Sequence, residues 1–169
     1  MIVDIYTETT FKSPRRQTGI LAYIIVIRYG SGHEDYTEKR MMQMRDATMQ
    51  EAELLVTAMA VARAAGMARL AGEKEFNIIS SNPWVGKMSD ANLSRWQENG
   101  YKNAKGEDIK HKDWWEALAK TKESRILRFS EEHEKGSGID GYQTWLKEQL
   151  EKTKVAPVQQ KGVKDGKVI

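Results

Sequence analysis

Few side chains in this sequence could carry chemistry, and the best candidates among them are carboxylates. The chain has no cysteine, which excludes a thiolate zinc site, a cysteine nucleophile and a disulfide scaffold. It shows no His/Asp/Glu spacing typical of zinc, no glycine-rich phosphate loop and no Ser/His/Asp order of a hydrolase. Two acids remain, Glu8 at the end of a strand-like segment and Glu53 on a helical one. Taken alone, each is more often a solvated surface acid than a ligand or catalyst.

A second group of candidate residues is basic and lies in the polar stretch 101–112. Its lysines could contact phosphates without reading a base sequence, and they are Lys102, Lys105, Lys110 and Lys112. Glu107 and Asp108 interrupt the run and leave a net charge of +2. An ordinary solvated loop could carry that charge, so both interpretations stay open.

Apolar patterning predicts the elements that must position these residues. β-Branched and aromatic content predicts strands, at 2–7, 20–29, 34–44, 76–80 and 126–129. Helical spacing predicts helices, at 48–65, 84–97, 113–121 and 142–150. The run 20–29 is apolar throughout, which is typical of a strand covered on both faces. Three strands in a meander followed by alternating helices and strands predict an α/β fold with one mixed five-stranded sheet and helices on both faces.

Local signals mark two helix starts and assign most tryptophans to packing. Thr48 and Glu51 match a capping box, which is a sufficient structural role for Glu51. Asn82 directly precedes Pro83 and is expected to cap the following helix. Four tryptophans are predicted to pack in the core or between helices and not to stack on bases: Trp96, Trp114, Trp115 and Trp145.

Charge divides the 169 residues into a neutral body and a basic end. The formal net charge is +3, and residues 151–169 account for all of it with five lysines and two acids. We therefore expect one domain over 1–150 and a flexible lysine-rich tail over 151–169, with any nucleic-acid surface on the body being a local patch. No apolar run approaches the roughly 20 residues that cross a bilayer. With no signal-peptide pattern either, we expect an intracellular protein without a membrane partner.

The order of the elements and four short motifs resemble the ribonuclease H family over residues 2 to about 150. The first three motifs are 5–10 (IYTETT), 49–55 (MQEAELL) and 78–83 (IISSNP). The fourth resembles bacterial-type members and combines Trp96, 99–103 (NGYKN), a basic loop and 111–115 (HKDWW). In those members the basic loop grips the DNA strand, which is the role that the resemblance implies for the four lysines.

The resemblance also implies a chemistry, hydrolysis of the RNA strand of RNA/DNA hybrids with two divalent metal ions. The family holds Mg²⁺ or Mn²⁺ with an Asp, a Glu and two further Asp residues. Glu8 stands at the first Asp, one methylene longer, and Glu53 stands at the family's Glu. Asn82 stands at the next Asp and lacks its charge.

The remaining family positions also depart from the pattern. The fourth acid falls on Gln143 without gaps, or on Asp140 if the register of the preceding loop differs. The histidine of the family's mobile loop corresponds to His133. The Asn-Asn-Arg that reads 2′-hydroxyls in the hybrid is replaced by 49–51 (MQE).

These replacements predict a ribonuclease H-like domain with impaired catalysis. We expect a module that binds an RNA/DNA hybrid, a duplex or a partner protein, with Glu8 and Glu53 as weak ligands of Mg²⁺ or Mn²⁺, or with no metal. One alternative is an active, atypical ribonuclease H in which Glu8, Glu53 and Asp140 hold metal with the Asn82 carbonyl. A second alternative is a purely structural interaction subunit.

Overall fold

The computed structural model describes residues 1–88, 90–131 and 141–153. Its strands and helices in chain order are β1 (Ile2–Thr9), β2 (Gln17–Arg28), β3 (Tyr36–Ala47), α1 (Met49–Gly66), a 3₁₀ turn (Ala68–Leu70), β4 (Glu75–Ile79), α2 (Pro83–Gly86), α3 (Asp90–Glu98), α4 (Lys112–Lys122), β5 (Ile126–Ser130) and α5 (Gly141–Lys152). This order matches the predicted one except that one predicted helix is divided in two, and most boundaries agree within three residues.

The strands form one mixed sheet in the order β3-β2-β1-β4-β5. β1, β2 and β3 are antiparallel neighbours, whereas β4 is parallel to both β1 and β5. The predicted mixed five-stranded sheet is therefore confirmed. Because β1, β4 and β5 run in the same direction, their carboxyl ends meet at one end of the sheet. Binding and catalytic side chains in open α/β sheets are commonly placed there.

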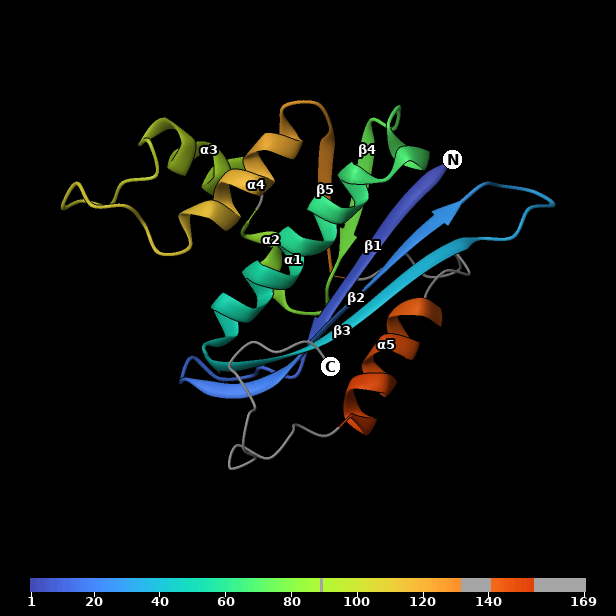
Figure 1. The fold of residues 1–169 in the computed structure, drawn as a ribbon, viewed down its shortest axis with the longest axis horizontal. Helices are drawn as coiled ribbons and strands as arrows, with labels where there is room; N and C mark the ends of the chain where they lie inside the picture. The colour runs from blue at the N-terminus through green and yellow to red at the C-terminus, as the bar shows by residue number, and fades with distance from the viewer. Residues whose placement is uncertain (89, 132–140, 154–169) are drawn as a thin grey trace.

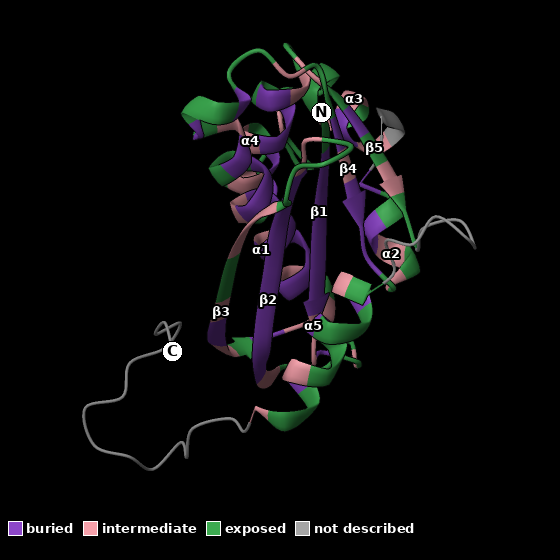
Figure 2. Ribbon diagram, turned by 90° about the vertical axis from the view of Figure 1, so that its right-hand side faces the viewer, coloured by how far each residue is buried: buried purple, intermediate pink, exposed green. Residues whose placement is uncertain are grey.

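Helices cover both faces of the sheet, as predicted. α1 packs on one face against β1 and β2, with α4 against α1 and α3 against α4. α5 lies on the opposite face, where it contacts β1 and β2 (Figure 1). Residues 19–27 of β2 are buried throughout, because side chains of both orientations meet a helical layer (Figure 2). Two apolar clusters result, one on each side of the sheet.

The prediction of one helix over 84–97 is wrong, because the structure divides this stretch into α2 and α3. Asn82 caps α2 as predicted, with Oδ1 accepting a 3.0 Å hydrogen bond from the backbone N–H of Trp84. After Gly86, the N–H of Lys87 bonds back to Trp84 over three residues, which tightens and ends the helical turn. The side chain of Asn92, on α3, then donates to the carbonyl of Lys87. The capping box at Thr48 and Glu51 is also present as predicted.

The tryptophans follow the packing expectation with one exception. Trp115 is buried, and Trp96 and Trp114 pack partly buried against the larger core. Trp145 is 37% exposed, and its ring lies outside the core, where Nζ of Lys39 on β3 lies 4.2 Å from the ring centroid. Within the described residues, no helix has the length and apolar character to cross a membrane. Residues 154–169, most of the predicted tail, lie outside the described residues.

Candidate functional site

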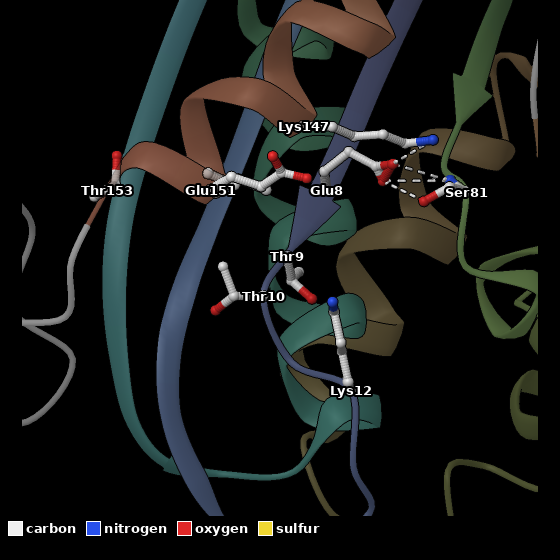
Figure 3. A pocket seen from close by; sticks show the side chains of 9 residues that line it. Glu8, Thr9, Thr10, Lys12, Ser81, Lys147, Glu151 and Thr153 are labelled. Atoms are coloured by element: carbon white, nitrogen blue, oxygen red, sulfur yellow. Dashed lines mark hydrogen bonds and ion pairs between the residues drawn. The ribbon is translucent and has the colours of Figure 1, made fainter.

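Glu8 lies at the carboxyl end of β1 and is buried against the end of β4. The parallel register pairs Tyr6 with Ile79, which brings Ser81 beside Glu8. The N–H of Ser81 lies 3.3 Å from each carboxylate oxygen, and its hydroxyl donates a 2.9 Å hydrogen bond to Oε2. Nζ of Lys147, on α5, lies 3.9 Å from Oε1 (Figure 3). Burial raises the pKa of Glu8, and the contacts with Ser81 and Lys147 oppose this increase.

Glu53 approaches the same end of the sheet from the first turns of α1. Its Oε1 accepts a 2.7 Å hydrogen bond from the hydroxyl of Thr9. Its Oε2 is buried and has no hydrogen-bond partner among the described residues. Burial raises the pKa of Glu53 to about 7; the hydrogen bond from Thr9 opposes this, and the negative charge of Glu8 adds to it. A substantial fraction of this carboxyl group is therefore protonated at neutral pH.

Two side-chain amides lie beside the two glutamates, at positions where the resemblance noted in the sequence leads us to expect acids. Asn82 interacts with Glu53 and lowers its pKa, while the Asn82 carbonyl oxygen is directed to the N–H of Trp84. Gln143 is buried in the first turn of α5, where its amide donates a 2.8 Å hydrogen bond to the carbonyl of Glu131. A hydrogen bond from Gln143 also lowers the pKa of Glu8.

The structure thus brings together four of the positions that the family resemblance selected: Glu8, Glu53, Asn82 and Gln143. Asp140 and His133, the other two predicted catalytic residues, lie outside the described residues.

Sequence reasoning missed three polar neighbours of the two acids, Thr9, Ser81 and Lys147. Thr9 and Ser81 are the chain neighbours of Glu8 and Asn82. Their hydroxyl groups, at the ends of predicted strands, could therefore have been predicted as hydrogen-bond donors to the acids. Lys147 follows Gln143 by four residues, a spacing that puts both on the same face of a helix.

The donors around the two acids do not suit a pair of divalent ions. Mg²⁺ is bound by several oxygen ligands, and two such ions need several converging carboxylates. Within 1–88, 90–131 and 141–153, no group of three His, Cys or acidic side chains could hold a metal ion. Ser81 and Lys147 present protons and positive charge to Glu8, and the carbonyl of Asn82 is occupied by the cap of α2. The described residues therefore do not fit a two-metal centre.

A cavity of about 570 Å³ opens beside Glu8 on the α5 side of the site. Its lining is mostly of polar residues and of mixed charge, with Glu8 and Glu151 as acids, Lys12 and Lys147 as cations, and Lys147 directly beside Glu8 (Figure 3). Glu8 therefore has an open approach, and Lys12 and Lys147 are among the residues that line it.

The four predicted lysines lie in or beside the loop that joins α3 to α4 and extends away from the sheet (Figure 1). Three of them are paired with acids of the chain itself. Lys102 and Lys112 lie 2.5 and 3.7 Å from Asp108, and Lys112 also lies 3.6 Å from Glu116. Lys110 lies 3.1 Å from Glu51 at the start of α1. The basic character of the loop is thus largely balanced within the protein.

Neither a protein-family model nor a curated protein sequence matches this chain. Solved structures do match it. The foamy viral protease–reverse transcriptase in complex with an RNA/DNA hybrid is 18% identical with a TM-score of 0.61, over 88% of this chain and 19% of that one. The ribonuclease H domain of prototype foamy virus is 20% identical with a TM-score of 0.58, over 88% and 90% of the two chains. LC9-RNase H1, a type 1 RNase H with the type 2 active-site motif, is 16% identical with a TM-score of 0.60, over 86% and 69%.

The fold class follows from the sheet order, from the helices on both faces and from these similarities. The chain has the ribonuclease H-like fold.

Proposed function

We propose that this chain is a ribonuclease H-like module that binds an RNA/DNA hybrid or duplex and has impaired catalysis. The observation that carries the proposal is the pair of amides, Asn82 beside Glu53 and Gln143 beside Glu8, at positions where the family has carboxylates. Each replacement removes one negative charge from a centre that would have to neutralise two divalent ions.

The hydrogen bonds around the remaining acids support the same conclusion. Glu8 is held by Ser81 and faces an ammonium group, and Glu53 has a pKa of about 7. At neutral pH an incoming metal ion would therefore have to displace a proton from part of the Glu53 population. Even small misplacements of catalytic groups, about 1 Å, can cost about a hundredfold in rate.

Nucleic acid is the proposed partner because of the structural neighbours and the basic loop. The foamy viral protease–reverse transcriptase has been solved with an RNA/DNA hybrid and with dsDNA. The four lysines of this chain lie on or beside a projecting loop, where they could follow a phosphate backbone (Figure 1).

Cleavage and binding assays on one labelled hybrid test the proposal. We expect no cleavage in Mg²⁺ or Mn²⁺ at enzymatic rates, and retention of the hybrid at low salt with affinity that falls as salt rises. Replacing Lys102, Lys105, Lys110 and Lys112 together by Gln should flatten the salt dependence. An unchanged salt slope would reject the lysines as the contact surface.

The buried Oε2 of Glu53 favours a second candidate, an active atypical ribonuclease H. An orphaned buried oxygen is costly, and a cation would satisfy it. Cleavage of the hybrid at an ordinary rate that is abolished by Glu53→Gln would establish this enzyme and overturn the binding module.

A further inference from the structure

Glu51 connects the basic loop to the start of α1. Nε2 of His111 lies 2.5 Å from Oε2 of Glu51, and Nζ of Lys110 lies 3.1 Å from the same oxygen. The guanidinium Nη1 of Arg16, from the β1–β2 connection, lies 3.5 Å from Oε1. The Glu51 side chain is only 11% exposed, whereas that of Lys110 is 61% exposed. One nearly buried acid therefore holds basic groups from two separate segments.

The contact with His111 also sets the shape of the loop. His111 has φ of 60° and ψ of 36°, a left-handed conformation that residues other than glycine seldom adopt. Its imidazole is fixed on one side by Glu51 and on the other by Trp114, with stacked rings 4.0 Å apart and 2° from parallel. α4 begins immediately after His111, so the contact with Glu51 lies at the junction of the loop and the helix.

The space around this contact is open. A cavity of about 310 Å³ lies beside it, and Gln50, Glu51, Lys110, His111 and Trp84 are among the residues that line it. An anion could therefore approach Lys110 without displacing packed side chains.

We propose that Glu51 is an internal competitor for phosphate that latches the basic loop to α1 and limits its electrostatic contact with nucleic acid. This inference rests on the proposed function and adds its regulation. While Lys110 is held by Glu51 it does not neutralise a phosphate, so the duplex is contacted by fewer cations than the loop carries. The Glu51 carboxylate thus neutralises positive charge of the loop that would otherwise displace counterions from the duplex.

Glu51→Gln tests the latch without removing the helix cap. Glutamine also serves in a capping box, so the bond to the N–H of Thr48 can persist while the negative charge is lost. The matched control is Glu38→Gln, which frees Arg63 from a 2.6 Å ion pair near the other end of α1 and changes the net charge by the same amount.

The first measurement is fluorescence anisotropy of a labelled short DNA duplex over a series of salt concentrations. We expect Glu51→Gln to steepen the slope of log affinity against log salt by about 1 to 2, and to tighten binding about three- to tenfold near 0.1 M salt. Glu38→Gln should leave the slope within about 0.5 of that of the unmodified protein. If the unmodified protein binds and Glu51→Gln leaves the slope unchanged, the latch is overturned.

The second measurement needs no nucleic acid. Hydrogen exchange should become faster at the loop amides of Asn103 and Ile109 in Glu51→Gln, with α1 still protected. Unchanged exchange in the loop overturns the latch, whatever the binding result. Faster exchange with no duplex binding by either protein at any salt overturns the proposed function, and the regulatory role of Glu51 with it.

Discussion

The hydroxyl of Thr9, at the end of β1, donates a 2.7 Å hydrogen bond to Oε1 of Glu53, in the first turns of α1. This bond joins two segments 44 residues apart and fixes one oxygen of the carboxyl group. The other oxygen, Oε2, is buried without a partner among the described residues. Within the part of the chain that the structure describes, only one of the two carboxyl oxygens of Glu53 therefore accepts a hydrogen bond. Because the group is buried, its protonation state affects the free energy of unfolding.

The first prediction concerns pH. The folded-state pKa of Glu53 is about 7, against an ordinary value of 4.5, so its contribution to stability is complete below pH 4.5 and is lost as pH rises through 7. Between pH 5 and 8, the free energy of unfolding should fall by about 3 kcal/mol less in Glu53→Gln than in the unmodified protein. Urea denaturation of both proteins in EDTA, across this range, measures the difference. Parallel curves would show that Glu53 titrates normally.

The second prediction concerns the missing acids. Asn82→Asp with Gln143→Asp should create a site that binds divalent ions, because four carboxylates then surround the space between Glu8 and Glu53. Aspartate also caps helices, so α2 should persist. We expect Mg²⁺ or Mn²⁺ to raise the Tm of the double variant by several degrees, and to restore detectable cleavage of the hybrid.

The same double variant in EDTA is its own control. Without metal it should be less stable than the unmodified protein at neutral pH, because clustered negative charges repel. Equal metal dependence of the two proteins would show that these positions do not form a metal site.

The third prediction concerns Ser81. Ser81→Ala removes a 2.9 Å hydrogen bond to the buried carboxylate of Glu8 and should destabilise the protein by about 1.5–3 kcal/mol at pH 8. The loss should be smaller at pH 4, where Glu8 is protonated and needs the donor less. Ser124→Ala is a suitable control, since that hydroxyl lies 3.4 Å from a carbonyl at the end of its own helix. A Ser81→Ala effect that does not vary with pH would contradict this role.

The fourth prediction separates the two faces of the sheet. Ile24 packs in the cluster beneath α5, and Ile25 packs in the cluster beneath α1. Each change to alanine should destabilise the protein by about 2–5 kcal/mol. Hydrogen exchange should accelerate selectively in α5 for Ile24→Ala, and in α1 and α4 for Ile25→Ala. The same exchange pattern for both variants would argue against two separable clusters.

Much of the fold could be predicted because local patterns agreed with the final packing. The apolar run of β2, the capping box at Thr48 and the cap at Asn82 each depend on residues close in sequence. The division of the helix expected over 84–97 into α2 and α3 was missed, because ending α2 after Gly86 leaves the apolar spacing of the segment unchanged. The exposure of Trp145 was missed because composition does not reveal which side of α5 meets the sheet.

The candidate site divides in the same way. The sequence by itself determined which residue types are present: two candidate glutamates, an amide at Asn82 and no cysteine. It also determined that the net charge of +3 lies in residues 151–169. Only the tertiary structure decided that Gln143 lies beside Glu8, that Lys147 faces the same acid, and that Glu51 holds Lys110 and His111. These contacts join residues 59 to 139 positions apart, and their geometry depends on how the strand ends and helices pack, which no local sequence pattern encodes.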